Sequence, residues 1–269
     1  VTNETQREQA MQRMAKRGAS VILGVGFAQA DAINTVAAEH PDKKFAIIDV
    51  SWLDQPNLRQ YAFKEHEGSY LVGMAAALAS KTGKVGFVGG MDIPLIRAFA
   101  CGYVQGVKKV KADMDVLQNM TGTTPAAWNN PGKGAELAQS QIDRGADVIY
   151  QAAGGTGIGV IRAAADAGKF SIGVDSNQNH LAPGSVLTSM LKRVDVAAYE
   201  TMKDAMSGKF DTGVRSLGLA EDGVGWALDE HNAKLITDDM KAQIEAASAD
   251  IVAGKITVHD YRSDSSCPN

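Results

Sequence analysis

This chain has a small net charge, few cysteines and no long apolar run. Its 27 Lys and Arg residues against 31 Asp and Glu give a net charge of −4, so no basic surface predicts binding to nucleic acid or to an anionic membrane. No run of about 18 apolar residues predicts a membrane-spanning helix. The first residues also lack the basic start and apolar centre of a signal peptide, which taken alone favours the cytoplasm. The remaining composition, 45% hydrophobic and 22% charged, is typical of a globular protein.

Two cysteines are too few to predict a disulfide scaffold. Cys101 lies in an apolar helical pattern and is expected to be a small buried side chain. Cys267 lies in a polar tail, residues 263–269, that we expect to fray. We therefore expect no bridge between them, and the pair leaves the redox compartment open.

The chain is a series of alternating strand and helix patterns. Short runs rich in Val and Ile, apolar on both faces, predict strands buried in a parallel sheet. Such alternation predicts an α/β fold with right-handed crossovers. The expected strands are 21–26, 45–50, 85–89, 116–120, 148–152, 171–175 and 186–191. The expected helices are 1–17, 30–39, 69–80, 95–110, 134–144, 157–167, 194–206 and 238–253.

Two breaks in this series predict two lobes. One is a polar turn just before Lys84, and the other lies near Thr188, where two extended stretches follow each other without a helix. We expect residues 1–83 with 189–211 to form an N-terminal lobe, and residues 84–188 with 212–269 to form a C-terminal lobe. Doubly wound lobes begin with a strand, so the opening helix predicts a further strand–helix unit upstream.

Candidate ligand-binding residues follow the strands, because ligands of open α/β sheets sit beyond the carboxyl ends of the strands. An isolated Asp at a strand end, such as Asp49 or Asp92, is more often a helix N-cap or turn residue than a ligand-binding group, whereas no helix directly follows Asp175. Phe27 and Tyr150 could stack on a flat ligand or belong to a core, and Trp128 interrupts a polar loop, so we expect it to line a cleft. The candidates at strand exits are Phe27, Asp49, Met91, Asp92, Gly154, Gly155 and Asp175.

The glycine-rich segment from Gly154 to Gly159 follows a strand and opens a helix, as in dinucleotide-binding enzymes. However, no G-x-G-x-x-G pattern can be placed there, and no Lys-Ser or Lys-Thr follows as in a Walker loop. H-E-x-x-H, C-x-x-C and G-x-S-x-G are missing, and no two histidines have the spacing of metal ligands. The pattern favours binding without chemistry, a cofactor or a metal. A cytoplasmic nucleotide-dependent enzyme on one Rossmann sheet is the alternative, and the lack of a helix-turn-helix disfavours a transcription regulator.

Several motifs resemble the basic membrane protein family of solute-binding lipoproteins, which includes the purine nucleoside receptors of bacterial ABC importers. This resemblance implies a type I periplasmic-binding-protein fold, in which two Rossmann-like lobes around a hinge close over the ligand. The motifs are G-V-G-F-A from Gly24, K-F-A-I-I-D from Lys44, K-V-G-F-V-G-G-M-D from Lys84, A-G-G-T-G from Ala153, I-G-V-D from Ile172 and L-T-S-M-L-K-R-V-D from Leu187.

The resemblance also implies a site and partners. In that family the purine stacks between aromatic rings, and motif matching assigns the ribose hydroxyls to Asp175 and Lys192. A carboxylate that accepts and an ammonium that donates suit a vicinal diol. The implied protein is not an enzyme but a monomer outside the cytoplasmic membrane, lipid-anchored or free in the periplasm. Its implied partners are a purine nucleoside or base and a membrane permease.

Overall fold

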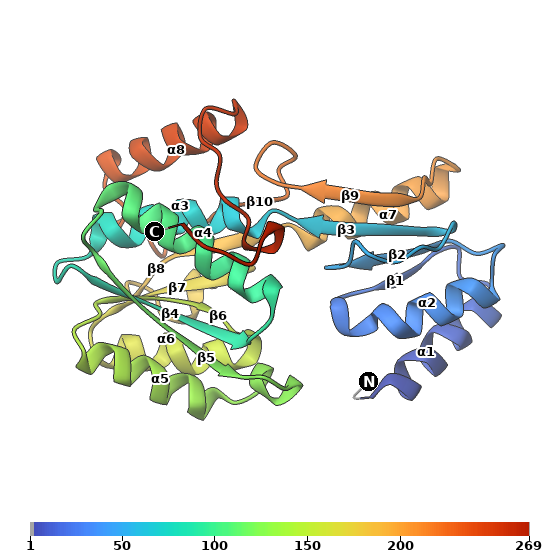
Figure 1. The fold of residues 1–269 in the computed structure, drawn as a ribbon, viewed down its shortest axis with the longest axis horizontal. Coiled ribbons are helices and arrows are strands. Elements are labelled where there is room, and N and C mark those ends of the chain that lie inside the picture. The colour runs from blue at the N-terminus through green and yellow to red at the C-terminus, as the bar shows by residue number, and fades with distance from the viewer. Residues whose placement is uncertain (1–2, 269) are drawn as a thin grey trace. The chain divides into compact units, whose positions relative to one another are not determined.

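The computed structural model describes residues 3–268, which form two α/β units (Figure 1). Unit 1 contains the chain up to Phe63 together with Arg193–Leu217, and unit 2 contains Lys64–Lys192 together with the chain from Gly218 onward. The chain leaves unit 1 one helix earlier than the predicted break before Lys84. The helix that precedes this break packs with unit 2, because its apolar face contributes to the core there.

Unit 1 contains a sheet of four parallel strands in the order β1-β2-β3-β9. The strands are β1 (Ile22–Gly24), β2 (Phe45–Ile48), β3 (Leu58–Phe63) and β9 (Gly213–Leu217). The helices α1 (Glu4–Lys16) and α2 (Ala30–Glu39) share an apolar cluster with β1 and β2. The first two residues of the predicted helix 1–17 lie outside the described residues.

A buried arginine joins the two chain segments of unit 1. Arg59 of β3 lies 2.9 Å from the carboxylate of Asp204 and donates from Nε to the carbonyl oxygen of Asp211 at 3.0 Å. Its guanidinium also stacks on the ring of Phe210, 4.3 Å from the ring centroid. Asp204 belongs to α7 (Val194–Ser207), so the second segment is fixed to β3 by charge-assisted contacts as well as by the strand pairing of β9.

Unit 2 contains a six-stranded sheet in the order β10-β8-β7-β6-β4-β5, in which only β10 is antiparallel to its neighbour. On one face, β4 and β6 pack against α5 and α6 through Val88, Ala138, Ile149 and Val160. The strands are β4 (Lys84–Met91), β5 (Asp115–Gly122), β6 (Val148–Ala152), β7 (Phe170–Asp175), β8 (Val186–Lys192) and β10 (Val224–Trp226). The two helices on this face are α5 (Pro131–Asp143) and α6 (Gly157–Asp166).

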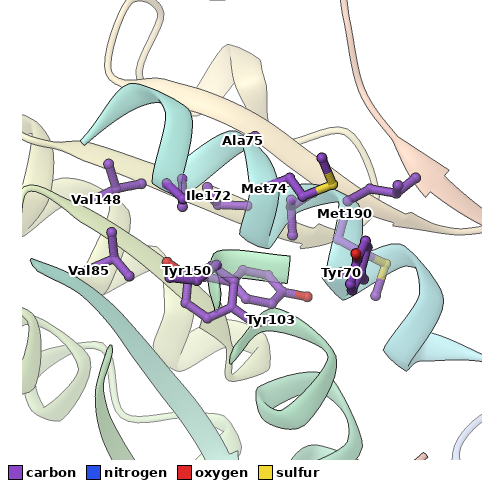
Figure 2. Packing of buried hydrophobic residues seen from close by; sticks show 14 of the residues in the cluster. Tyr70, Met74, Ala75, Val85, Tyr103, Val148, Tyr150, Ile172 and Met190 are labelled. Carbon is purple, nitrogen blue, oxygen red and sulfur yellow. The ribbon is translucent and has the colours of Figure 1, made fainter. Parts of the chain in front are cut away.

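The other face carries the main core of unit 2 (Figure 2). Here α3 (Glu65–Ala79) and α4 (Pro94–Val110) cover the sheet, and α8 (Asp238–Val252) packs on α3. The rings of Tyr103 and Tyr150 lie next to each other with centroids 5.2 Å apart. No helix within residues 3–268 has the length and hydropathy needed to cross a membrane.

Glycines bring the backbones of α3 and α4 together. A Cβ atom added at Gly102 would lie 2.2 Å from the carbonyl oxygen of His66, and one at Gly106 would lie 2.0 Å from that of Tyr70. Conversely, a Cβ atom at Gly73 would lie 2.3 Å from the carbonyl oxygen of Tyr103. A real Cβ atom cannot approach an oxygen so closely, so this helix pair depends on residues without side chains.

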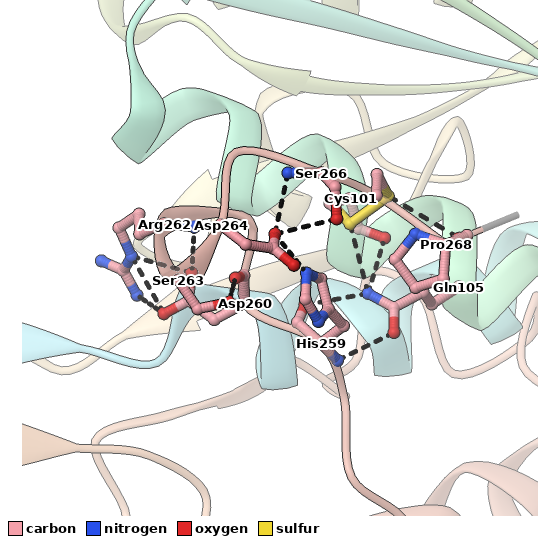
Figure 3. The surroundings of a disulfide bond; sticks show 10 residues. Cys101, Gln105, His259, Asp260, Arg262, Ser263, Asp264, Ser266 and Pro268 are labelled. Atoms are coloured by element: carbon pink, nitrogen blue, oxygen red, sulfur yellow. Dashed lines mark hydrogen bonds and ion pairs between the residues drawn. A yellow bond between two sulfur atoms is a disulfide. The ribbon is translucent and has the colours of Figure 1, made fainter.

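The prediction that Cys101 and Cys267 stay unbridged is wrong, because the two cysteines form a disulfide (Figure 3). Cys101 is buried on α4, as expected. Within the described residues the tail contacts the chain before it: it follows the short 3-10 helix η5 (Tyr261–Ser263), Ser265 donates its backbone N–H to the carbonyl oxygen of Tyr261 at 2.8 Å, and the Asp264 carboxylate lies 3.0 Å from Nε2 of His259. Side chains far apart in sequence hold this tail, and local polarity does not reveal them.

Candidate functional site

The carboxyl ends of four neighbouring strands gather most of the predicted ligand-binding residues at one edge of the unit 2 sheet. The strands β4, β6, β7 and β8 are parallel neighbours, so their last residues meet at the same edge. The predicted residues at this edge are Met91, Asp92, Trp128, Gly154, Gly155, Asp175 and Lys192.

Asp175 is the last residue of β7 and is exposed. Its φ angle is 65°, in the left-handed region that costs energy for residues other than glycine. A tight turn follows, in which Ser176 donates its backbone N–H to the carbonyl oxygen of Val174 at 2.8 Å. As predicted, no helix begins directly after this carboxylate.

Lys192 ends the neighbouring strand β8, one residue beyond the register partner of Asp175. It is only 8% exposed, and its ammonium lies 3.1 Å from a carboxylate oxygen of Glu65, the first residue of α3. The ring of Phe99 lies beneath it, with its centroid 5.8 Å from Nζ. The ammonium is therefore fixed by α3 and α4, which the sequence does not indicate.

Tyr150 is fully buried in the core, which agrees with the second of the two interpretations that the sequence left open for it. Its hydroxyl group contacts that of Ser69 at 3.2 Å. Burial raises the pKa of Tyr150 well above its usual value, the Ser69 hydrogen bond opposes this, and the carboxylates of Asp175 and Glu65 raise it further. The pairing of Asp175 with Leu191, the residue before Lys192, places Asp175 on the strand next to the Glu65–Lys192 ion pair.

Trp128 ends the 3-10 helix η2 (Pro125–Trp128), and its indole ring packs on the bare backbone of Gly90. A Cβ atom at Gly90 would lie 2.2 Å from Cζ3 of the ring. The hydroxyl groups of Thr121 and Thr156 both donate to the carbonyl oxygen of Ala127, at 3.0 and 2.7 Å. Trp128 is half-buried and packs against the core of unit 2. We call this fixed ring the Trp128 platform.

Gly154 and Gly155 form the turn η3 (Gly154–Thr156), which leads into α6. Gly154 has a φ angle of 56°, and a Cβ atom at Gly155 would lie 3.2 Å from the carbonyl oxygen of Trp128. The two glycines therefore allow the turn to lie against the backbone of Trp128.

Asp92 is held by Arg97 of α4 through two contacts of 2.7 Å. The hydrogen bonds from Arg97 lower the pKa of Asp92. It is therefore not the helix N-cap that the sequence also suggested, since Ile93 occupies that position. Met91, at the end of β4, is half-buried.

Phe27 and Asp49 belong to unit 1. Phe27 begins the 3-10 helix η1 (Phe27–Gln29) and packs against the unit 1 core. Asp49 follows β2 with a φ angle of 69° and donates its backbone N–H to the carbonyl oxygen of Tyr61 at 2.8 Å. The element that follows Asp49 is the strand β3 and not a helix, so the N-cap interpretation is wrong.

Sequence reasoning missed two charged residues behind this edge. Glu65 is fully buried, and Arg262 of the tail approaches its second carboxylate oxygen at 3.0 Å. An acid in the first turn of a helix is ordinary, and a lone arginine in a polar tail gives no signal. Within the described residues, no three His, Cys, Asp or Glu side chains gather to hold a metal ion.

Known proteins match this chain along most of its length. The nucleoside-binding protein BmpA of a Lactococcus lactis ABC transporter is 35% identical in an alignment covering 90% of this chain and 72% of that protein. The CD4+ T-cell-stimulating antigen of Listeria monocytogenes is 37% identical, covering 88% and 70%. The crystal structure of an ABC transporter solute-binding protein from Aeropyrum pernix superposes with a TM-score of 0.85 at 29% identity, covering 97% of this chain and 82% of that one.

A family model described as "ABC transporter substrate-binding protein PnrA-like" matches residues 1–261. The names of this model and of BmpA describe binding proteins rather than enzymes, which agrees with the prediction from the sequence. The match covers nearly all of both units. The chain belongs to the Bmp family of PnrA-like substrate-binding proteins of ABC transporters.

Proposed function

We propose that this protein binds a purine nucleoside, or its base, at the carboxyl edge of the unit 2 sheet. In this proposal it acts as a monomer outside the cytoplasmic membrane, lipid-anchored or free, and delivers the ligand to an ABC permease. The observation that carries the proposal is that the neighbouring strands β7 and β8 end in Asp175 and Lys192. The name of the relative BmpA, a nucleoside-binding protein, supports the same class of ligand.

The chemistry of the two side chains suits a ribose. A vicinal diol both donates and accepts, so the Asp175 carboxylate can accept one hydroxyl proton while the Lys192 ammonium donates to an oxygen. The strained φ angle of Asp175 agrees with a role in function, since such strain concentrates at binding sites. The Trp128 platform at the same edge offers an aromatic surface for the flat purine ring.

The test compares a nucleoside with its free base by calorimetry. The most tightly bound of adenosine, guanosine and inosine is the probe, and the variants are Asp175→Asn and Lys192→Met. Asn tolerates the left-handed conformation of position 175, and Arg262 still neutralises Glu65 after Lys192 is removed. Each variant is expected to lose about 2–4 kcal/mol of nucleoside binding, because a hydrogen-bonded charge is removed from a desolvated hydroxyl.

The free base has no diol, so its affinity is expected to change much less. Asp166→Ala is the matched control, because Asp166 is exposed at the end of α6, which runs from the carboxyl edge to the opposite edge of the sheet. Equal losses for nucleoside and base, or no loss for either, would contradict the ribose-binding role of both residues.

A further inference from the structure

The last residues of the chain form a segment that is fastened at both ends to α4. We call residues 258–268 the C-terminal strap (Figure 3). The disulfide Cys101–Cys267 fixes its far end. At its near end, Gln105 donates to the carbonyl oxygen of His259 at 3.0 Å and accepts from the His259 backbone N–H at 2.8 Å. All of these contacts lie within unit 2.

Between these two fastenings the strap presents Arg262. Asp260 accepts from Nε of Arg262 at 3.0 Å and from Nη2 at 2.9 Å, and it also caps η5. The remaining guanidinium nitrogen, Nη1, lies 3.0 Å from Oε2 of Glu65. A planar guanidinium held by two parallel bonds has little freedom to turn, so its direction toward Glu65 is set by the strap.

Glu65 therefore binds two cations from different parts of the chain. Its Oε1 oxygen meets the Lys192 ammonium at 3.1 Å and its Oε2 oxygen meets Arg262, while its own side chain is fully buried. Two acids, Glu65 and Asp260, face two bases, Lys192 and Arg262, so the group is balanced in charge. Stability alone is a weak reason for such a group, because apolar residues of equal volume in place of buried ion pairs often stabilise a protein.

We propose that the C-terminal strap positions Lys192 for ligand through Glu65, with Arg262 as the connecting residue. Arg262 holds one oxygen of Glu65, so the carboxylate can offer only the other to Lys192. Without Arg262, both oxygens are available to the ammonium, which then turns toward α3 and donates less to a ligand. Because the disulfide fastens the strap, the affinity also depends on the oxidation state of Cys101 and Cys267. The effect on affinity rests on the proposed function.

The first arm of the test follows Lys192 itself, without ligand. In protein labelled with ¹⁵N-lysine, the side-chain resonance of Lys192 is assigned from the Lys192→Met variant. Arg262→Gln is expected to shift this resonance, and so is the double variant Cys101→Ser/Cys267→Ser or reduction of the intact protein. Arg144→Gln is the matched control, since it removes the same charge from an exposed position after α5, on the opposite face of the sheet. A Lys192 resonance that stays in place in Arg262→Gln overturns the inference.

The second arm measures binding of the nucleoside probe and of its base. Arg262→Gln and the reduced protein are expected to bind the nucleoside about fivefold or more weakly, with the base unaffected. If Lys192→Met weakens nucleoside binding and Arg262→Gln does not, the inference is wrong and the proposed function stands. If Lys192→Met itself leaves the affinity unchanged, or the unmodified protein binds none of the three nucleosides, the proposed function is wrong. In that case the resonance alone decides whether the strap controls Lys192.

Discussion

The substitution Gly90→Ala adds one methyl group beneath the indole ring and so tests whether the Trp128 platform contacts the ligand. Because a Cβ atom there would overlap the indole ring, Gly90→Ala is expected to displace the ring and to weaken nucleoside binding about tenfold, the loss of one stacking contact. The change in tryptophan fluorescence on titration is expected to shrink in the same variant, and Trp128→Ala to remove most of it.

Gly122→Ala is the control for that experiment, since the nearest atom to its added Cβ is 3.6 Å away, on Ala127. A fluorescence response that persists in Trp128→Ala belongs to Trp52 or Trp226 and would contradict a ligand contact of the platform.

His66 makes the stability of the protein depend on pH. Burial lowers the pKa of His66 from 6.5 to about 4; Asp260 opposes this shift, whereas Arg262, Lys64 and His259 add to it. Since the folded pKa lies below the unfolded one, the neutral form stabilises the fold fully above pH 6.5, and this contribution falls as the pH decreases toward 4. At pH 5 the loss amounts to about 2 kcal/mol.

Urea unfolding of the protein and of His66→Gln at pH 7 and pH 5 measures this contribution. The variant is expected to lose less stability between the two values than the unmodified protein, because Gln does not titrate. The same loss in both proteins would show that other groups cause the pH dependence.

At the scale of elements, α3 and α4 lie so close together that there is no room for a side chain at the glycines of their contact. Gly106→Ala is expected to lower the free energy of unfolding by about 1–3 kcal/mol, because a Cβ atom would force the helices apart. Gly132→Ala in α5 is the control: its nearest neighbour would be 3.6 Å away, and alanine favours a helix over glycine. Urea unfolding measures both variants, and equal stability of the two would contradict this account.

The sequence predicts an element when a single local pattern, such as an apolar run, marks it. It misses an element or a contact that depends on residues far apart in the chain. Buried strands such as β6 and β7 appear as apolar runs, so their ends, including Asp175, can be located from the sequence. The strand β3 contains Arg59 and Gln60, both buried and polar, and its partner β9 is largely exposed, so neither forms an apolar run. The partners of Lys192 also stay hidden, because Glu65 and Arg262 are brought to it only by packing.

At the scale of the molecule, the disulfide links two residues 166 positions apart, both in unit 2. Such a crosslink restricts mainly the unfolded chain and is worth about 2–4 kcal/mol. In hydrogen exchange, reduction or the double Cys→Ser variant is therefore expected to lower the protection of unit 2 amides, in β4, β6 and β7 above all. Unit 1 amides, in β2 and β3, serve as the internal control. Equal loss of protection in both units would contradict an effect confined to unit 2.

The division of unit 1 into two chain segments has a consequence for synthesis on the ribosome. The strand β3 is made long before its neighbour β9, and all of Lys64–Lys192 emerges between them. During this interval β3 presents an unpaired edge, and Arg59 lacks the two carboxylates that neutralise it. A nascent chain that ends before residue 193 thus exposes a surface that can pair with other chains. This edge stays open to such pairing until β9, the last strand of unit 1, has been synthesised.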